Sequence, residues 1–434
     1  MDNPSNKPLL QELAWRGLLH QVTAQTELEK HLATASRTGY CGFDPTSDSL
    51  TIGNLLPILQ LRRFQHAGHK PIVLMGGGTG LIGDPSGKDA ERALRSRDQI
   101  LANVAAQRKI FERLIDLDPK RANAAEIVNN ADWLEKLGFI EVLRDVGKHF
   151  SINAMIQRDS VRDRLTQREQ GISYTEFSYM LLQAYDYLHL YRTKGVTIQL
   201  AGSDQYGNIV SGIDLIHRSE GTEAHAYALT NPLLTKADGK KIGKTEKGAI
   251  WLSPERTSPY AFYQYFLNVD DADVISFLKW YTMRGQEEIA ELAQRHQAAP
   301  EQRHAQRELA RDITRLVHGD SELTKAEAAS AALFSGDVRS LAPDLLREVF
   351  ADVPHTQHAK QLLEGEGLPV LDLLPQTSLA NSKREARQFL EAGAVLVNGE
   401  KATLDQRLTS GSLLHGQTIL LKRGKKQWHA TRWE

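Results

Sequence analysis

The stretch Tyr40–Asn54 combines residue types that suit a phosphate-binding site. Its sequence predicts the end of a buried strand, a turn at Asp44-Pro45-Thr46 and the start of an amphipathic helix. The first backbone N–H groups of a helix lack partners and its dipole favours an anion, so a phosphate can bind there. Thr46, Thr51 and Asn54 add side-chain donors on the same rim. The alternative is an ordinary strand-to-helix turn, which recurs in every α/β protein.

A second strand, turn and helix follow the same pattern. Residues 196–201 predict a buried strand, Gly202–Asn208 a glycine-containing turn and Ile209–Ile216 a helix. Ligands of open α/β sheets lie beyond the carboxyl ends of the strands at such turns. Asp204 and Gln205 are therefore predicted to face the same crevice as the first stretch.

Two glycine-containing loops could bring positive charge to that crevice. The first, residues 80–92, carries Asp84, Lys88 and Arg92. The second, residues 236–245, has four lysines and two glycines. Lysine is a compact charge that suits phosphates, and mobile loops often close over phosphoryl-transfer sites. A solvated surface loop is the alternative for each.

One predicted helix carries three polar residues on one face. Tyr179, Gln183 and Asp186 are spaced i, i+4 and i+7 and are flanked by apolar residues. Burying them without partners would be costly. That face is therefore either exposed to solvent or lines a polar pocket.

The elements that must position these residues follow in order along the chain. Residues 9–36 predict helices packed on the first strand, and Lys70–Met75 predict a second buried parallel strand. Residues 96–170 are mostly helical and charged, which indicates an insertion between two halves of a nucleotide fold. Residues 254–318 have the apolar spacing of an all-α unit, and residues 334–368 indicate a loosely structured connector.

The C-terminal segment is basic. Residues 369–434 contain ten Lys/Arg and six Asp/Glu, so they carry about +4 and the remainder about −5. Ser382–Glu385 predicts a capping box that opens a short helix ending at Gly393, followed by a strand, a turn at Asn398-Gly399 and a basic hairpin. A basic helix beside a basic hairpin suits the phosphates of a structured RNA, and a plain basic surface is the alternative. The candidate RNA-binding residues are Lys383, Arg384, Arg387, Lys422, Arg423, Lys425 and Lys426.

Length and composition describe an ordinary globular protein. The 434 residues allow two or three domains, and 41% hydrophobic and 25% charged residues are typical values. The single cysteine, Cys41, excludes an internal disulfide framework and fits a reducing compartment. The N-terminus lacks the features of a secretory signal, and no apolar run of about 18 residues spans a membrane. We therefore expect a cytoplasmic protein.

Taken together, these stretches resemble bacterial tyrosyl-tRNA synthetases, a family of class I aminoacyl-tRNA synthetases, from about residue 9 to the C-terminus. Five separate motifs occur in the family's order and spacing. Thr51-Ile52-Gly53-Asn54 stands where the family has His-Ile-Gly-His, and Lys241-Ile-Gly-Lys-Thr245 is similar to its second ATP motif. Tyr206 and Ala201 are milder departures, from tryptophan and glycine.

The resemblance implies an α/β fold: a Rossmann-type parallel-sheet catalytic domain, followed by an all-α domain and a small α+β RNA-binding domain. It implies a domain at residues 1–228 with the insertion at about 96–170, the lysine loop and helical domain at 229–335, a connector at 336–368 and the RNA-binding domain at 369–434. It also implies a homodimer, for which the helices between Asp132 and Val146 are the expected surface.

The resemblance further implies an enzyme that joins L-tyrosine to tRNA(Tyr) through tyrosyl-adenylate, with ATP as a substrate carrying Mg²⁺ and without a metal site of its own. The expected catalytic residues are Thr46, Thr51, Asn54, Lys88, Arg92, Lys241, Lys244 and Thr245. The expected tyrosine-binding residues are Tyr40, Asp84, Tyr179, Gln183, Asp186 and Gln205, with Tyr40 and Asp186 bracketing the phenol. The expected ATP-binding residues are Asp44, Gly53, Gly202, Asp204 and Lys244.

Selection against phenylalanine would follow from Asp186, because without the phenol a buried carboxylate loses its partner. The size of that effect is known for this enzyme family and is not a result obtained from this sequence.

The departure in the first motif leaves two other functions open. Asn54 can still donate through its amide, while the shorter Thr51 hydroxyl falls short or needs a water, so we expect activity with Thr51 the weaker contributor. An RNA-binding protein that has lost activation is the first alternative. An amino-acid ligase with another substrate or product is the second. Retention of the predicted tyrosine and ATP residues argues against the first, and the basic tail argues against the second.

Overall fold

The computed structural model describes residues 8–84, 95–158, 161–162, 165, 171–239, 242–245, 248–335, 338–351, 353–424 and 427–434. The chain divides into two compact units: Met1–Ser258 with Tyr265–Val317, and Pro259–Gln264 with His318–Glu434. None of the helices in the described part of the chain has the length and apolar character that a membrane crossing requires.

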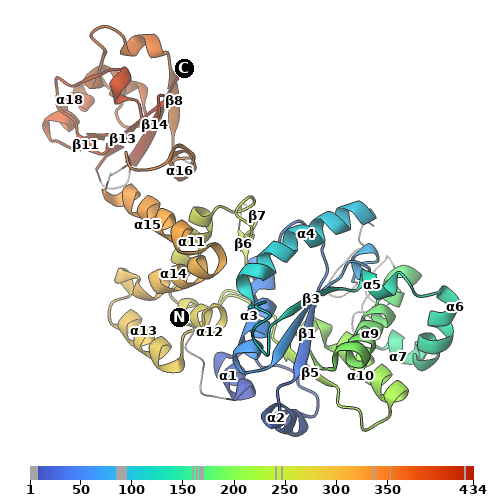
Figure 1. Ribbon diagram of the computed structural model, residues 1–434. Coiled ribbons are helices and arrows are strands. Elements are labelled where there is room, and N and C mark those ends of the chain that lie inside the picture. Colours follow the sequence, from blue (N-terminus) through green and yellow to red (C-terminus); the bar gives the residue numbers. More distant parts are fainter. Residues whose placement is uncertain are drawn as a thin grey trace. The chain divides into compact units, whose positions relative to one another are not determined.

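A five-stranded parallel sheet forms the centre of the first unit (Figure 1). Its strands lie in the order β3-β2-β1-β4-β5. The order reverses at β1 and β4, which is the crevice where ligands of doubly wound folds bind. The strands are β1 (Thr38–Phe43), β2 (Lys70–Met75), β3 (Glu126–Asn129), β4 (Val196–Gly202) and β5 (Tyr227–Asn231). The predicted Rossmann-type sheet is confirmed.

The strand β3 corrects one expectation. Residues 96–170 were expected to form a mostly helical insertion, yet they include β3, which pairs with β2 at the edge of the sheet. This strand has four residues, all half-buried. Neither an apolar run nor an alternating pattern of useful length marks such a short edge strand.

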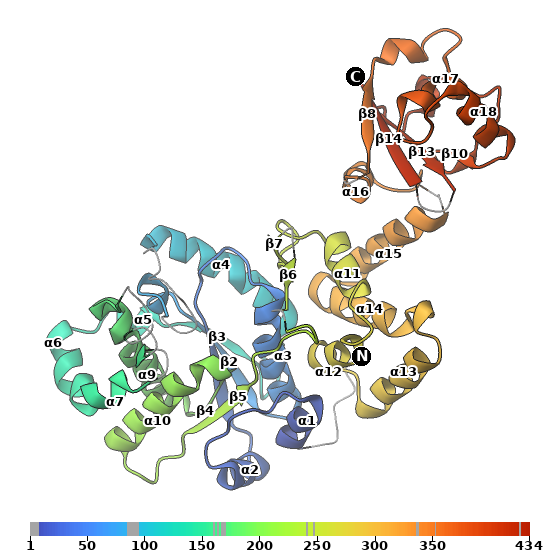
Figure 2. The same ribbon diagram turned by 180° about the vertical axis from the view of Figure 1, so that it is seen from behind.

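Helices cover both faces of the sheet, with α3 on one side and α9 and α10 on the other (Figure 2). The helix α9 begins after Ser173, whose side chain accepts a hydrogen bond from the backbone N of Glu176, and ends at Gly195 with φ of 63°. The helices and short turns of this part are α1 (Leu9–Arg16), α2 (Gln25–Thr34), α3 (Ile52–His66), η1 (Thr79–Leu81), α4 (Arg97–Leu114), α5 (Ala131–Leu134), α6 (Phe139–Glu141), η2 (Val142–Val146), η3 (Gly147–His149), α7 (Ile152–Ile156), α9 (Tyr174–Lys194), η4 (Ser203–Gln205) and α10 (Tyr206–Glu220).

A helical segment completes the first unit, as predicted for residues 254–318. It contains α12 (Val274–Tyr281), α13 (Gln286–Ala298), η5 (Pro300–Gln302) and α14 (His304–His318), while α11 (Pro259–Leu267) crosses from one unit to the other. A small hairpin of β6 (Lys244–Thr245) and β7 (Gly248–Ala249) precedes it.

Two buried arginines join the sheet part to the end of α12. Arg16 donates to the carbonyl oxygens of Lys279 at 2.7 Å and Arg284 at 2.6 Å. Arg63 donates to the carbonyl oxygens of Trp280 at 2.8 Å and Thr282 at 2.9 Å. The last carbonyls of a helix have no helical partner and carry partial negative charge, so these cations cap α12 and fix its position.

The second unit ends in an α+β fold. Its sheet has the order β11-β10-β13-β14-β8, and β9 pairs with β12 separately. The predicted helix is α18, capped by Ser382, and the predicted hairpin is β13 and β14. The elements are α15 (Asp320–Ser335), α16 (Pro343–Val349), β8 (His355–His358), η6 (Lys360–Leu363), β9 (Leu368–Pro369), α17 (Val370–Leu373), η7 (Leu374–Gln376), α18 (Lys383–Glu391), β10 (Val395–Val397), β11 (Glu400–Lys401), β12 (Arg407–Leu408), η8 (Ser410–Ser412), β13 (Thr418–Arg423) and β14 (Gln427–Trp433).

The expectation of a loosely structured connector at residues 336–368 was wrong for its described residues. The helix α16 packs on the same hydrophobic cluster as β13 and β14, through Leu346 and Phe350. The strand β8 pairs in parallel with β14 at the edge of the sheet. Pro343 stands in the first turn of α16, where its missing N–H costs nothing, so a proline at this position does not indicate a loop. The proposed domain bounds stay a prediction.

Candidate active site

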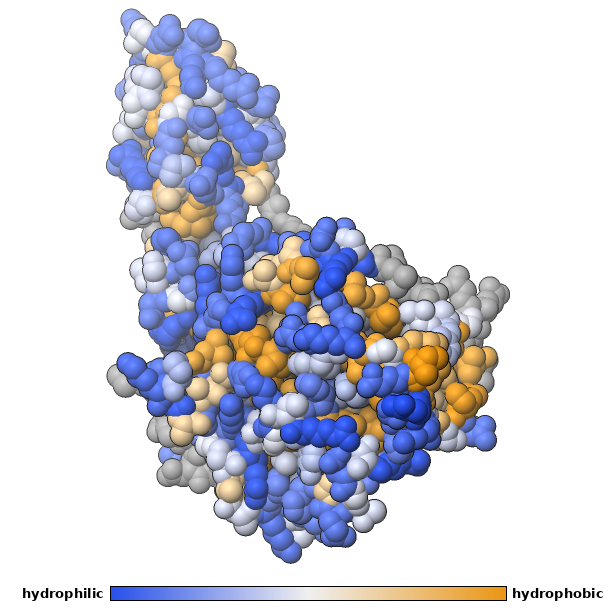
Figure 3. Space-filling view, turned by 45° about the vertical axis from the view of Figure 1, so that its right-hand side comes forward, coloured by the Kyte–Doolittle hydropathy of each residue, from blue (hydrophilic) through white to orange (hydrophobic). Residues whose placement is uncertain are grey.

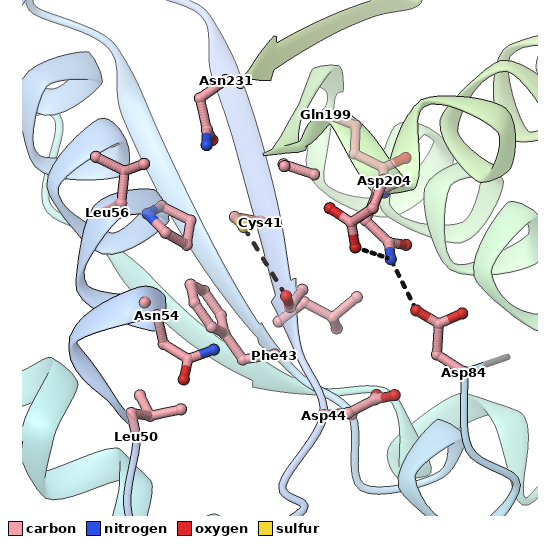
Figure 4. A pocket seen from close by; sticks show the side chains of 18 of the residues that line it. Cys41, Phe43, Asp44, Leu50, Asn54, Leu56, Asp84, Gln199, Asp204 and Asn231 are labelled. Carbon is pink, nitrogen blue, oxygen red and sulfur yellow. Dashed lines mark hydrogen bonds between the residues drawn. The ribbon is translucent and has the colours of Figure 1, made fainter. Parts of the chain in front are cut away.

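A cavity of about 620 Å³ opens at the carboxyl ends of the parallel strands, between α3 and α9. Most of the predicted site residues line it, from both sides of the sheet's switch point (Figure 4). These lining residues are Tyr40, Asp44, Thr46, Gly53, Asn54, Asp84, Tyr179, Gln183, Asp186, Gly202, Asp204 and Gln205. The polar face of α9 is therefore the wall of a pocket and not a solvent face.

The carboxylate of Asp186 is buried at one end of this cavity, with 2% of the residue exposed. Its two oxygens accept hydrogen bonds from Asn130 Nδ2 at 2.9 Å and from Trp133 Nε1 at 2.8 Å. Burial raises the pKa of Asp186 to about 7, although the two donors act in the opposite direction. The group can therefore change its protonation near neutral pH.

The sequence analysis did not identify Asn130 and Trp133 as site residues. Both directly follow β3, which was read as part of an insertion. Gly78 N also donates to Asn130 Oδ1 at 2.7 Å, which fixes the orientation of the Asn130 amide. The signal that could have found them is the polar pair Asn129-Asn130 directly after Ile127-Val128, the same strand-end pattern as in the other motifs.

Tyr40 brings a hydroxyl to the same part of the cavity from β1. Its oxygen is buried and has no hydrogen-bond partner within the part of the chain that the structure describes. Burial raises the pKa of Tyr40 well above its usual value, and the negative charge of Asp186 adds to that shift. An unpaired buried hydroxyl costs about 1–3 kcal/mol, which a ligand that supplies a partner would recover.

Asp44 and Tyr179 join the turn after β1 to α9. The Tyr179 hydroxyl donates to Asp44 Oδ2 at 2.9 Å, and Thr79 Oγ1 donates to Asp44 Oδ1 at 2.8 Å. Asn130 Nδ2 also lies 2.9 Å from Thr79 Oγ1. This chain of hydrogen bonds runs from Asp44 to Asp186 and fixes both carboxylates relative to each other.

A second chain of hydrogen bonds holds the opposite wall (Figure 4). Gln205 Nε2 donates to Asp84 Oδ2 at 2.7 Å and to Asp204 Oδ2 at 3.1 Å. Asn208 Nδ2 donates to Gln205 Oε1 at 3.1 Å and to Gln183 Oε1 at 3.0 Å. Burial raises the pKa of Asp204, and the nearby charge of Asp84 adds to it. Four aspartates thus face one cavity, which favours a positively charged ligand group.

The first motif, Thr51–Asn54, forms the start of α3, as predicted, but its two polar side chains point to different places. Asn54 lines the cavity, and its amide nitrogen points into it (Figure 4). Thr51 is not a lining residue: it is the N-cap of α3, and its hydroxyl donates to Asn54 Oδ1 at 2.9 Å. The Thr51 hydroxyl is therefore directed at Asn54, and the phosphate contact expected of it stays a prediction.

The second motif lies against the first. Gly243 N donates to the Tyr265 hydroxyl at 3.1 Å, and Gly243 O accepts from Ile250 N at 3.0 Å. Ile250 O in turn accepts from Ile52 N at 3.1 Å, next to an antiparallel bridge between Thr51 and Trp251. Backbone hydrogen bonds therefore connect the two predicted nucleotide-binding motifs.

Several predicted residues cannot be placed. Lys88, Arg92, Lys241, Lys425 and Lys426 lie outside the described residues, and of Lys244 and Thr245 only the backbone, in β6, is described. In the described ranges, no group of three or more His, Cys, Asp or Glu residues has an arrangement that could hold a metal ion.

The candidate RNA-binding residues of the second unit fall into two groups. Lys383, Arg384 and Arg387 are exposed on α18. Lys422, by contrast, is 3% exposed and its ammonium lies 4.8 Å from the ring centre of Trp428. Arg423 stacks on Phe389 and donates to Gln427 Oε1 at 2.6 Å. Lys422 is thus buried and Arg423 is held by contacts within the unit, while an RNA-binding role for either residue stays a prediction.

The chain is similar to known proteins over nearly its whole length. Residues 33–335 match the family described as tRNA synthetases class I (W and Y), and residues 346–431 match the tyrosine–tRNA ligase SYY-like C-terminal domain. The tyrosine–tRNA ligase of Geobacillus kaustophilus is 50% identical over 98% of this chain and 99% of its own length. That of Roseiflexus castenholzii is 49% identical over 98% and 99%. A C-terminally truncated mitochondrial tyrosyl-tRNA synthetase of Coccidioides posadasii has a TM-score of 0.66 and 32% identity, covering 74% of this chain and 92% of its own.

The buried carboxyl of Asp186 makes stability depend on pH. Its pKa is about 7 in the folded protein against 3.8 for the free side chain. Between these values it holds a proton only in the folded state, so its stabilising contribution is complete below about pH 4 and is lost as pH rises through about 7. Asp186→Asn removes this titration. We expect the free energy of unfolding of the variant, relative to wild type, to rise by about 2 kcal/mol from about pH 5 to about pH 8.

Urea denaturation at the two pH values measures this difference. Asp98→Asn, on the exposed first turn of α4, serves as the control. An equal difference for Asp186→Asn at both pH values would contradict the buried titration.

Proposed function

Because the chain belongs to the tyrosine–tRNA ligases, in class I of the aminoacyl-tRNA synthetases, we propose that it activates L-tyrosine with ATP and transfers the tyrosyl group to the 3′ end of tRNA(Tyr). The structural observation that carries this proposal is the pairing of a buried carboxylate on α9 with a buried hydroxyl on β1, in Asp186 and Tyr40. A phenol can donate to the first group and accept from the second. Phenylalanine can do neither.

The acidic and polar side chains near Asp44 suit the ammonium group of the substrate. Asp84, Tyr179 and Gln183 line the cavity near Asp44, and we assign the ammonium to them. Gln205 is assigned to the substrate carboxylate. Asp204 is assigned to the ribose of ATP, and Asp44, Gly53 and Gly202 are assigned to ATP binding. Each assignment follows the family motif that the residue matches.

In the first step, the carboxylate of tyrosine attacks the α-phosphorus of ATP in line, and pyrophosphate leaves. A carboxylate is already a nucleophile, so the step needs no general base. Catalysis then consists of positioning the reactants and neutralising the charge that grows on the leaving group. We assign that neutralisation to Asn54, Thr46, Lys88, Arg92, Lys241, Lys244 and Thr245, with Mg²⁺ arriving on ATP as part of the substrate. In the second step, a ribose hydroxyl of tRNA attacks the acyl carbon and AMP leaves.

We further propose a homodimer in the cytoplasm, where ATP and tRNA are found.

The dimer surface is suggested by large hydrophobic side chains that are exposed around α6 and α7, on the surface that Figure 3 shows. Ile140 is 73% exposed and Phe139 66%. Exposed apolar patches of this kind mark protein interfaces. The patch consists of Phe139, Ile140, Leu143, Ile152 and Tyr174.

Pyrophosphate exchange tests the proposed activity. With purified protein, we expect ATP–pyrophosphate exchange that depends on tyrosine and is absent with phenylalanine or without an amino acid. Absence of exchange with every amino acid would overturn the proposal and favour an RNA-binding protein that has lost activation. Exchange with a different amino acid would favour a ligase of another substrate.

The apolar patch predicts the oligomeric state. Ile140→Asp places a charge in the patch, so we expect the variant to sediment as a monomer while the wild type sediments as a dimer. Leu101→Ser changes a hydrophobic residue of α4 that is 46% exposed, and it should stay dimeric. A monomeric wild type, or a dimeric Ile140→Asp, would exclude this patch as the interface.

The exposed basic residues of α18 predict that the second unit contributes to tRNA binding. Arg387→Gln should weaken tRNA binding and lower the slope of log Kd against log salt by about one, because one phosphate contact is lost. Pyrophosphate exchange, which needs no tRNA, should keep its rate. Arg347→Gln removes an exposed arginine of α16 that pairs with Asp344, and it serves as the control. Equal salt slopes for both variants would remove α18 from the RNA-binding surface.

A further inference from the structure

Thr51 and Asn54, the two residues that depart from the family histidines, are bonded to each other. Asn54 Oδ1 accepts two hydrogen bonds from Thr51, one from Oγ1 at 2.9 Å and one from the backbone N at 3.0 Å. Thr51 is the N-cap of α3 and Asn54 is its third helical residue, so the pair forms a capping box across the first turn.

This geometry determines which end of the Asn54 amide faces the cavity. A backbone N–H can only donate, so the amide atom that meets Thr51 N must be the oxygen. The amide nitrogen is then directed the other way, into the cavity, as Figure 4 shows. Since Nδ2 has no acceptor among the described residues, both of its N–H groups can donate to a ligand.

We propose that Thr51 is a positioning residue for adenylate formation, which acts through Asn54 and not on the substrate. This inference rests on the proposed function. By holding the amide oxygen, Thr51 presents the donor end of Asn54 to the oxygens of the nucleotide. A freely rotating amide would place its oxygen there in part of the molecules, where it would repel a phosphate.

Backbone contacts hold Thr51, and with it the Thr51–Asn54 pair, in a fixed position. Thr51 forms an antiparallel bridge with Trp251, and Ile52 N donates to Ile250 O at 3.1 Å. The cap residue is thus held by the segment that follows the second motif. Its hydroxyl donates to Asn54 Oδ1, and the β-branched side chain has few rotamers.

A double-mutant cycle tests the proposal by the rate of tyrosine-dependent pyrophosphate exchange. Thr51→Val keeps the shape and the backbone N–H but removes the hydroxyl, one of the two donors that hold the amide oxygen of Asn54. We therefore expect kcat to fall by up to about tenfold, the loss that one hydrogen bond of ordinary strength produces. The KM for tyrosine should not change. In the Asn54→Ala background, Thr51→Val should change kcat by less than about twofold, because the residue through which it acts is gone. Thr51→Ser should restore most of the rate.

Two further variants separate positioning from folding. Asn54→Asp keeps an acceptor for Thr51 but has no donor for the nucleotide, so it should lose at least as much rate as Asn54→Ala. Ser382→Ala removes the N-cap of α18, and we expect a lower melting temperature with unchanged exchange. Melting curves of every variant report whether it is folded.

The outcomes are distinguishable. Absence of tyrosine-dependent exchange in the wild type would overturn the proposed function itself. With an active wild type, an unchanged kcat for Thr51→Val would overturn the positioning role. So would an equal loss from Thr51→Val with and without Asn54, because that result would mean a direct contact of Thr51 with the substrate.

Discussion

The buried carboxylate of Asp186 sets requirements that the surrounding structure meets. A charge at that depth is costly without donors, and both donors come from the chain directly after β3. Asn130 and Trp133 reach Asp186 only because β3 pairs with β2 and brings their segment to the carboxyl edge of the sheet. The position of a four-residue edge strand thus decides whether the cavity has a stable acceptor for a phenol. Even with both donors, burial leaves its pKa near 7, so part of the cost remains until a ligand binds.

The sequence was most informative where one strong local pattern acts alone. Buried parallel strands, glycine turns and capped helices follow from periodicity and turn chemistry, and the face of α9 that carries Tyr179, Gln183 and Asp186 follows from helical spacing. The sequence was not informative for strands whose pairing partners are far away along the chain. The strands β3 and β8 are short edge strands whose partners are far along the chain, and their local patterns are too short to identify them as strands. Lys422 shows the same limit: its place on β13 was readable, but its contact with Trp428 depends on the pairing of β13 with β14.

Thr51 shows how a residue can keep its place in a motif and take another role. Position and polarity predicted a hydroxyl directed at a phosphate. The helix start imposes a stronger demand, because its first N–H groups lack partners and a side chain at N3 can satisfy the cap. Asn54 is short enough to reach back to Thr51 and still present its nitrogen to the cavity. Two histidines would not form this particular pair, so the two departures are best understood as one coupled change.

The negative charge of the cavity walls means that ATP binding requires additional basic residues. The described lining residues include four aspartates and no Lys, Arg or His. Such walls attract the ammonium of an amino acid and repel a triphosphate. The proposed reaction therefore requires the basic residues that the sequence motifs predict for phosphate binding, such as Lys88 and Lys244, together with the Mg²⁺ that ATP carries. The backbone connection from Ile52 through Ile250 to Gly243 gives the second of these segments a fixed attachment next to the donor end of Asn54. We thus attribute substrate selection to the acidic walls and phosphate activation to the basic motifs, of which the segment at Gly243 is attached to the start of α3.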